Sequence, residues 1–345
     1  MRKVLRGLFA LILLPVLVAG CGGTITITLP GGSGAPGTPP GAVSGSAPPK
    51  VAAKVAARAA AKAAPVAKAL ALPVGYARLY SPAAHAFRFS TMGEPVRRGV
   101  TSERFELREG DCGGSDCGTS RARTEIAQDR TVTTARLDRD IWYGWSFYNA
   151  SMRAVTRDRS LGTVLGQWKL EGDQPSSFRL VQVASGDGDM ARCNSAVCTK
   201  GGGPGDDVML ELDEMAQAAG WGAAQNKGRI CRLFSLEANR GRWVDIVVNT
   251  NFGTGKNGYV RVWVNGELRC NYQGQVVSSR AARAASPGPT DRRGIFNSFT
   301  ERWTKALGAT PKPTLVAYYD EFLSGASRAE VDTRMRAAQG LPPVN

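Results

Sequence analysis

Short runs in which apolar and polar residues alternate recur throughout residues 76–345, and this period of two is typical of β-strands with one buried face. Asn265-Gly266 lies between two such runs and predicts a tight hairpin turn. A helical period is confined to residues 210–219 and 328–338. Many antiparallel strands with few helices predict an all-β sandwich or jelly roll. The clearest strands are expected at residues 96–108, 142–148, 161–169, 177–183, 243–249, 259–264, 268–272 and 316–322.

The first 20 residues have a different pattern, that of an export signal. Three basic residues precede an apolar run over residues 7–19, which is too short to span a bilayer as a helix. Residues 17–21 read LVAGC and resemble the lipobox of bacterial lipoproteins. The resemblance implies that residues 1–20 are removed and that a lipid-carrying Cys21 anchors the chain in the bacterial cell envelope, at the outer membrane, in the periplasm or at the cell surface. An ordinary secretory signal with a chance cysteine is the alternative.

Residues 21–75 are expected to form a tether rather than a domain. Residues 31–49 are rich in Gly, Pro, Ser and Ala and carry no charge, so they cannot bury enough surface to offset the entropy of ordering. The alanine-rich residues 51–72 favour a helix. Basic residues at every fourth position would then form one stripe, which fits either a solvated spacer or a contact with anionic lipid headgroups. These basic residues are Lys50, Lys54, Arg58 and Lys62.

The charge of the chain narrows the class of partner. The full chain has 44 basic and 29 acidic residues and a net charge of +15. Residues 1–75 hold eight basic residues and no acidic residue, so residues 76–345, which we expect to fold as one domain, keep an excess of seven positive charges. Such an excess suits an anionic partner, either a uronate polysaccharide or a nucleic acid, and charge alone does not choose between them.

Seven cysteines are typical of a protein that matures in an oxidising compartment. With Cys21 assigned to lipid, six remain, and their spacing favours Cys112–Cys117, Cys193–Cys198 and Cys231–Cys270 as disulfides. A four-cysteine metal site is the alternative, but C-x4-C is wider than the usual metal spacing and His85 is the only histidine. No cofactor is expected. The aspartates at positions 187, 189, 206 and 207 fit either turns or a structural calcium site.

Several segments, taken in chain order, resemble one known group of enzymes. Arg123-Thr124-Glu125 is similar to an R-[ST]-E motif, Gln167-Trp168-Lys169 lies where the group carries Gln-x-His, and residues 292–296 lie where it carries Lys-x-Gly-x-Tyr. Residues 104–111, 142–148, 258–266 and 320–325 resemble further strands of the same group. The group is that of the jelly-roll polysaccharide lyases, which includes alginate, glucuronan and heparin lyase-like proteins. The resemblance covers most of residues 88–325 and implies a concanavalin-like β-jelly roll sandwich with a few short helices.

The resemblance also implies a chemistry, the β-elimination of a uronate polysaccharide. Gln and Arg neutralise the sugar carboxylate, a base takes the C5 proton, and an acid protonates the leaving O4. Arg123 and Gln167 match the carboxylate positions, and Lys169 replaces the histidine on the same strand face as Gln167. A lysine base needs a lowered pKa, which like-charge repulsion from Arg123 and Arg292 is expected to provide. Phe296 replaces the tyrosine and cannot transfer a proton.

The candidate catalytic residues are therefore Lys169, Gln167 and Arg123. Arg292 replaces the lysine of the group, and the side chains expected to bind substrate are Arg292, Tyr143, Trp145 and Asn297. The partner implied is an anionic polysaccharide, with no nucleic acid, and the protein is expected to be a monomer. His85 precedes the first matched strand and is not expected to be catalytic. The possible substitutes for the missing tyrosine are Tyr143, Tyr148, Tyr259, Tyr318 and Tyr319.

Two other functions stay open at this point. The changed residues at 169 and 296 also fit a catalytically silent carbohydrate-binding lipoprotein of the same fold. The third hypothesis is a jelly-roll protein of unrelated role, such as a glycoside hydrolase or an envelope structural protein. A hydrolase needs two carboxylates that flank the scissile bond, and Glu125 is one candidate without an evident partner in the sequence.

Overall fold

The computed structural model describes residues 72–80, 82–170, 174–186, 203–219, 228–283 and 288–344. All of them lie in one unit of the chain, Pro65–Asn345. The predicted signal peptide, Cys21, most of the predicted tether, the pair Cys193–Cys198 and the aspartates at 187 and 189 lie outside the described residues. None of the helices in the described ranges is long and apolar enough to cross a membrane.

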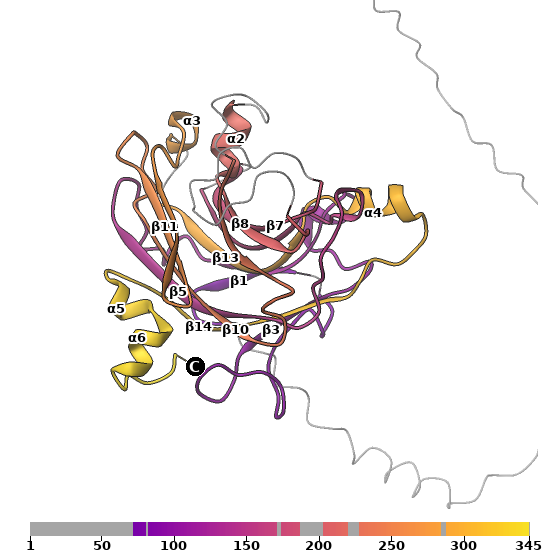
Figure 1. The fold of residues 1–345 in the computed structure, drawn as a ribbon, viewed down its shortest axis with the longest axis horizontal. Helices are drawn as coiled ribbons and strands as arrows, with labels where there is room; N and C mark the ends of the chain where they lie inside the picture. Colours follow the sequence, from indigo (N-terminus) through magenta and orange to yellow (C-terminus); the bar gives the residue numbers. More distant parts are fainter. Residues whose placement is uncertain are drawn as a thin grey trace, which may run out of the picture. The chain divides into compact units, whose positions relative to one another are not determined.

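Two antiparallel sheets of seven strands each form the body of this unit, which confirms the all-β jelly-roll sandwich (Figure 1). The first, called sheet A, has the order β1-β4-β13-β6-β7-β8-β9. The second, called sheet B, has the order β12-β11-β10-β5-β14-β3-β2. Sheet A consists of β1 (Tyr76–Tyr80), β4 (Ala122–Gln128), β13 (Thr290–Asn297), β6 (Thr163–Lys169), β7 (Ser176–Val183), β8 (Asp207–Glu211) and β9 (Arg229–Ser235). Sheet B consists of β12 (Glu267–Gln273), β11 (Tyr259–Val264), β10 (Trp243–Thr250), β5 (Ile141–Asn149), β14 (Leu315–Gly325), β3 (Glu103–Leu107) and β2 (Phe87–Phe89).

Short helices lie at the margins of the sandwich. Helices α5 and α6 lie beside sheet B, where α5 contacts β5 and β14, and α4 lies at one end of the molecule (Figure 1). The predicted helix at residues 328–338 is confirmed, although it is broken in two. The predicted helix at residues 210–219 is wrong at its start, because residues 210 and 211 complete β8. The helical elements are η2 (Gly114–Asp116), η3 (Arg157–Arg159), α2 (Asp213–Ala219), α3 (Ser279–Ala282), α4 (Thr300–Leu307), α5 (Arg328–Val331) and α6 (Thr333–Ala338).

Aromatic side chains fill the space between the two sheets. Trp168 of sheet A stacks on Phe178, with ring centroids 4.5 Å apart, and also contacts Tyr143 and Trp145 of sheet B. Aromatic rings carry large apolar surfaces whose burial is a main source of stability. Trp168 therefore commits one face of β6 to the core, and its neighbours Gln167 and Lys169 lie on the other face of sheet A.

Tyr319 connects the two sheets by hydrogen bonds. It belongs to β14 of sheet B, and its hydroxyl contacts the carbonyl oxygens of Leu165 at 2.6 Å and Gly294 at 2.7 Å, both in sheet A. The strand register shifts at both places, between Val164 and Gly166 and between Arg293 and Phe296. Gly294 has φ of +130°, and a Cβ atom there would lie 2.2 Å from the carbonyl oxygen of Thr124. Only glycine fits this position.

Two predicted disulfides are present in the described residues. Cys112–Cys117 closes the short loop that contains η2. Cys231–Cys270 joins β9, at the edge of sheet A, to β12, at the edge of sheet B. These four cysteines are therefore not ligands of a metal.

Candidate active site

The outer face of sheet A brings the predicted polar residues together. Gln167 of β6 lies directly opposite Arg292 of β13 on one side and Arg179 of β7 on the other. Residues that are directly opposite in an antiparallel pair point to the same face. Lys169 lies two residues after Gln167 and shares that face. Lys169, Gln167 and Arg292 thus form one cluster, as the sequence predicts.

Gln167 is held at both ends of its side-chain amide. Its Nε2 donates to Oε1 of Glu125 at 2.7 Å, and its Oε1 accepts from the hydroxyl of Ser176 at 2.6 Å. Glu125 is fully buried, with 0% of its surface exposed. A buried polar side chain with both ends bonded has one orientation, because a flip of the amide would break both bonds. The second hydrogen of Nε2 is not used in these bonds.

Arg123 already has carboxylate partners within the protein. Its guanidinium donates to both carboxylate oxygens of Asp116, to Oδ1 at 2.8 Å, and to Glu125 at 3.3 Å. It also lies over the ring of Phe296, 4.3 Å from the centroid. Only 13% of the Arg123 side chain is exposed. Asp116 belongs to the disulfide-closed loop, so this loop holds Arg123 in place from outside the sheet.

Arg292 differs from Arg123 in its lack of a carboxylate partner among the described residues. It forms no ion pair with any described residue, and its buried Nε lacks a hydrogen-bond partner. Burial lowers the pKa of Arg292, because removal from water disfavours the charged form. An arginine that is desolvated and unpaired has its fork of donors available to a planar anion such as a carboxylate.

Lys169 has the lowered pKa that a lysine base requires. Burial is the largest cause, followed by the charges of Arg292 and Arg123, and together they lower the pKa to about 8. Glu125 and Asp213 oppose the shift. A pKa near 8 leaves a useful fraction of neutral amine close to neutrality. The expected repulsion from the two arginines is thus confirmed, although burial contributes more.

Charged residues continue across the same face on β7, β8 and β9. Arg179 contacts Glu211 at 2.5 Å and Asp213 at 3.2 Å, and Arg229 contacts Glu211 at 3.7 Å. Glu211 lies opposite Arg179 in the strand register. Each carboxylate here is shared with an arginine, so this part of the face is internally neutralised.

Three residues that were predicted to bind substrate do not face this cluster, and those predictions are wrong. Tyr143 and Trp145 are 1% and 2% exposed and point into the core from β5 of sheet B. Asn297 is buried, and its Oδ1 accepts a hydrogen bond from Thr163 at 3.1 Å. Alternation along β5 separates two faces, but both faces carry aromatic residues, so the sequence does not indicate which face packs in the core.

No tyrosine of the predicted set replaces the hydroxyl that Phe296 lacks. Tyr143 and Tyr148 belong to β5, Tyr259 to β11, and Tyr318 and Tyr319 to β14, all in sheet B. His85 contacts Asp111 at 2.8 Å, beside the disulfide loop, and shows no contact with Gln167 or Lys169.

Two of the four aspartates considered for calcium, Asp206 and Asp207, lie in the described residues, and both have protein partners. Asp207 accepts from Arg232 at 2.6 Å, and Asp206 accepts from the hydroxyl of Ser235 and the backbone N–H of Glu237. Within the described ranges no group of three or more acidic, histidine or cysteine side chains has a geometry suited to a metal ion.

Two residues of the site were missed from the sequence. Ser176 begins β7 and fixes Gln167, and Asp116 fixes Arg123. Asp116 could have been noticed as the one acidic residue enclosed by the C-x4-C segment. Ser176 had no comparable signal, because its role depends on how β6 pairs with β7.

The chain belongs to the polysaccharide lyase family, whose family model matches residues 76–323. Among solved structures, it is similar to an endo-β-1,4-glucuronan lyase from the fungus Trichoderma reesei, with 13% identity, a TM-score of 0.45, and coverage of 76% of this chain and 98% of that chain. A family 7 alginate lyase has 11% identity, a TM-score of 0.44, and coverage of 73% and 94%. The alginate lyase from Klebsiella pneumoniae has 12% identity, a TM-score of 0.42, and coverage of 71% and 85%. No curated protein matches the chain.

Proposed function

We propose that this protein is a polysaccharide lyase that cleaves a uronate-containing polymer by β-elimination. The observation that carries the proposal is the grouping of three side chains on sheet A. Lys169 has its pKa lowered to about 8, Arg292 has no ion-pair partner among the described residues, and Gln167 is fixed in one orientation. A base, a cation and a fixed amide donor are the groups that removal of a proton next to a carboxylate requires.

Arg292 and Gln167 bind the carboxylate of the sugar in this proposal. Arg292 contributes a charge that no described residue pairs with, and Gln167 contributes its remaining amide hydrogen. Both stabilise the negative charge that moves onto the carboxylate as the C5 proton leaves. Arg123 is a positioning residue here, because Asp116 and Glu125 occupy its donors.

Lys169 carries out both proton transfers. Its neutral amine takes the C5 proton, and the electron pair of the broken C–H bond forms the C4=C5 double bond while the C4–O4 bond breaks. The resulting ammonium then gives the same proton to O4, which leaves as the hydroxyl of the released chain. The amine is regenerated, so the step balances without water, metal or a second residue.

The use of one residue as both base and acid also restricts the configuration of the sugar that can be cleaved. One amine can reach the C5 proton and O4 only when both lie on the same side of the ring. This holds for β-D-glucuronate and β-D-mannuronate, whereas in α-L-guluronate the two lie on opposite sides. The proposed substrate is therefore a polymer of glucuronate or mannuronate units.

The carboxylates of this face do not support hydrolysis. Glu125 is bonded to Gln167 and Arg123, and Glu211 and Asp213 are paired with Arg179. A hydrolase needs one carboxyl group to donate a proton and a second to attack or to activate water. Carboxylates whose oxygens already accept hydrogen bonds from arginine or glutamine side chains are not free to take either role.

A catalytically silent carbohydrate-binding protein is the second candidate, and Phe296 is the observation that favours it. Its ring lies under Arg123, where the lyase group carries a tyrosine, and the tyrosines of the predicted set lie in sheet B. A polymer would then be held by Arg292, Gln167 and Lys169 without cleavage.

Absorbance of the conjugated C4=C5 double bond distinguishes the two candidates. The full chain is mixed with polyglucuronate, polymannuronate and a heparin-type polymer, and the absorbance is followed with time. We expect it to rise with a polyuronate, and to stay flat for Lys169→Ala and Gln167→Ala. Arg139→Ala, an exposed arginine before β5, is the control and should keep the rate. A flat trace on every polymer, with binding retained, establishes the silent binding protein instead.

We also propose that Cys21 carries lipid and holds the protein in the cell envelope. The support is the sequence of residues 17–21 after the short apolar run. Mass spectrometry of the N-terminal peptide, with Cys21→Ser as the comparison, tests it. An unmodified Cys21 in a membrane-free fraction contradicts the proposal.

A further inference from the structure

The outer face of sheet B carries a row of aromatic and polar side chains that the proposed mechanism does not use. Trp142 of β5 lies opposite Asn249 of β10. Arg261 of β11 lies opposite Asn249 on one side and opposite Asn271 of β12 on the other. Residues directly opposite in antiparallel strands point to the same face. The apolar residues next to them on each strand belong to the core, so these four residues, called the sheet B row, point outward.

Arg261 lies in the middle of the sheet B row and has only neutral partners among the described residues. Its guanidinium donates to Oδ1 of Asn249 at 3.2 Å and to Oδ1 of Asn271 at 3.3 Å. It also lies over the ring of Tyr259, 4.4 Å from the centroid. These contacts use part of the five N–H groups of a guanidinium and none of its charge. Arg261 thus has a fixed orientation and keeps both donors and charge for a ligand.

Asp140 is the carboxylate beside this row, and its oxygens already accept hydrogen bonds from three neutral groups. Nε1 of Trp142 donates to it at 3.0 Å, Nδ2 of Asn249 donates at 2.7 Å, and the hydroxyl of Tyr259 is the third donor. The amide of Asn249 lies between the two charges, since its Nδ2 bonds Asp140 and its Oδ1 bonds Arg261. Asp140 therefore fixes the two aromatic side chains and forms no direct ion pair with Arg261.

Trp142 presents apolar surface at one end of the row. Its ring stacks on that of Trp263, with centroids 5.3 Å apart and an angle of 26° between the planes. The guanidinium of Arg328, from α5, lies 4.9 Å from the centroid of the Trp263 ring. Trp142 and Trp263 are both only half-buried. A half-buried indole that is held on one side leaves apolar ring surface on which the flat face of a sugar can pack.

The sheet B row has the dimensions and the rigidity of a site for a short stretch of polymer. It crosses three strand spacings, which is about 14 Å. All four side chains stand on strands, and a ligand loses less free energy to ordering when the groups that bind it are already fixed. The row is separate from the candidate active site, because Gln167 and Lys169 lie on the outer face of sheet A.

We propose that the sheet B row is a second binding site for a uronate polysaccharide, in which Trp142 packs on a sugar ring and Arg261 binds a sugar carboxylate. The planar fork of an arginine matches a carboxylate, and a neutral sugar would leave the charge of Arg261 without a partner. A polymer bound on sheet B keeps the protein among its chains, which raises their effective concentration near Lys169. The choice of a uronate polymer rests on the proposed lyase function, whereas the position of the row does not.

Isothermal titration of the full chain with a glucuronate hexasaccharide tests the proposal, with a neutral glucose hexasaccharide of the same linkage for comparison. All proteins carry Lys169→Ala and Arg292→Ala, so that no cleavage occurs and binding on sheet A is weakened. The row variants are Arg261→Gln, which removes the charge and keeps a polar side chain, and Trp142→Ala. They are measured separately, so that a loss of stability in one leaves the other as a test.

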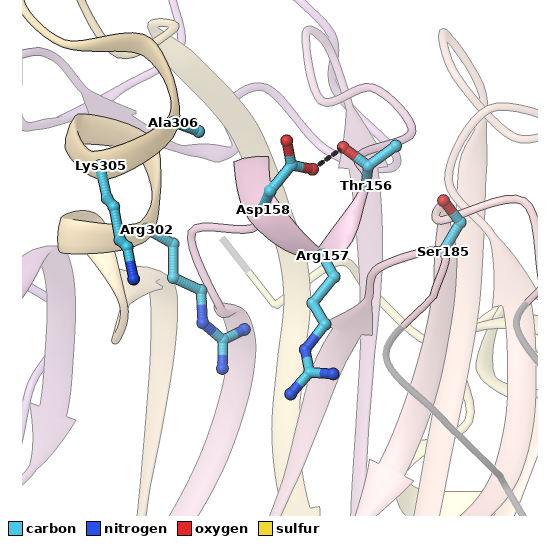
Figure 2. A pocket seen from close by; sticks show the side chains of 7 residues that line it. All are labelled: Thr156, Arg157, Asp158, Ser185, Arg302, Lys305 and Ala306. Carbon is cyan, nitrogen blue, oxygen red and sulfur yellow. Dashed lines mark hydrogen bonds between the residues drawn. The ribbon is translucent and has the colours of Figure 1, made fainter.

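Each row variant has a matched control. Trp243→Ala removes a second half-buried tryptophan from the outer face of β10, at the other end of that strand. Lys305→Ala removes one positive charge at an exposed position of α4, in the pocket that Figure 2 shows. Both lie outside the sheet B row.

We expect Arg261→Gln to bind the glucuronate hexasaccharide at least about tenfold more weakly than Lys305→Ala, because a charge-assisted contact is lost. Its affinity for the neutral hexasaccharide should equal that of the control. Trp142→Ala should bind both sugars more weakly than Trp243→Ala. Equal affinity of the row variants and their controls overturns the proposal, and so does equal affinity of the parent protein for the two sugars. Failure of the lyase proposal is seen separately, as the absence of double-bond absorbance with the unmodified chain.

Discussion

The side-chain amide of Gln167 donates a hydrogen bond of 2.7 Å to the fully buried carboxylate of Glu125. The same carboxylate accepts from Arg123 at 3.3 Å. Glu125 therefore fixes two neighbouring side chains at once, although it lies below the surface on which a substrate would bind. Its role in the site is to hold the orientation of groups that act on the substrate.

Glu125→Gln tests this role. The substitution removes the charge that Arg123 and Gln167 share, and we expect unfolding to become easier by about 3 kcal/mol and turnover to fall strongly. Glu211→Gln is the matched control, since Glu211 is also a buried carboxylate bonded to an arginine. It should lose comparable stability in urea unfolding and keep its turnover. Equal turnover of the two variants would show that Glu125 is only a structural residue.

The pKa of Lys169 and its proposed role as the base predict how the reaction rate depends on pH. The neutral amine is the base, and its pKa is about 8, so kcat/KM should rise with pH and level off above about 8. Lys169→His should move this rise to lower pH, because the ordinary pKa of histidine is about 6.5. Lys169→Ala should lose about 10²- to 10⁴-fold at every pH. An unchanged pH profile in the histidine variant contradicts the assignment of Lys169 as the base.

Phe296→Tyr should not increase the rate. Lys169 supplies both proton transfers in the proposed mechanism, so a new hydroxyl beside Arg123 has no step to perform. Initial rates on polyglucuronate, compared with those of the unmodified chain, measure this directly. A clear gain in turnover would mean that an acid is missing from the site and that Lys169 acts only as the base.

The sugar configuration should decide which polymers are cleaved. Polyglucuronate and polymannuronate place the C5 proton and O4 on one side of the ring, and polyguluronate does not. We expect faster double-bond formation on the first two at equal polymer concentration. Polyguluronate as the fastest substrate would require separate groups for base and acid, on opposite sides of the sugar.

The two disulfides should affect different properties. Removal of Cys231–Cys270, whose bonded positions are 39 apart in sequence, should cost about 4 kcal/mol of unfolding free energy and leave kcat unchanged. Removal of Cys112–Cys117 should cost about 2 kcal/mol and also lower kcat, because Asp116 in its loop holds Arg123. Serine pairs at each position, assayed by urea unfolding and by turnover, separate the two effects. Equal kcat in both variants would show that Asp116 does not depend on its loop.

The sequence predicts most of the fold where strands have one buried face. β5, β6, β7, β10, β11, β12 and β14 all coincide with predicted runs, within two or three residues at each end. β13 has no such signal, because Thr290–Asn297 is polar on one face and carries Asp291 and Arg293 on the other. Those two residues form a buried ionic network with Glu103 and Tyr76, which alternation of apolar residues cannot reveal.

The sequence also predicts the central cluster of the site, and the reason is local. Gln167 and Lys169 are on one strand, so their shared face follows from spacing alone. The different roles of Arg123 and Arg292 do not follow from spacing. They depend on Asp116 and Glu125, which contact Arg123 only in the folded protein. The predictions for Tyr143 and Trp145 are wrong for the same reason. The side of β5 that faces sheet A is decided by tertiary packing and not by the sequence of β5 itself.

The hydrogen bonds from Tyr319 to Leu165 and Gly294 have a consequence for how this protein can diverge. They hold β6 and β13 at the two places where their registers shift, close to Gln167 and Arg292. The spacing between those two side chains therefore depends on Tyr319, which belongs to sheet B. Substitutions around Tyr319 in sheet B can change which polymer fits the site without changing any residue that contacts the polymer.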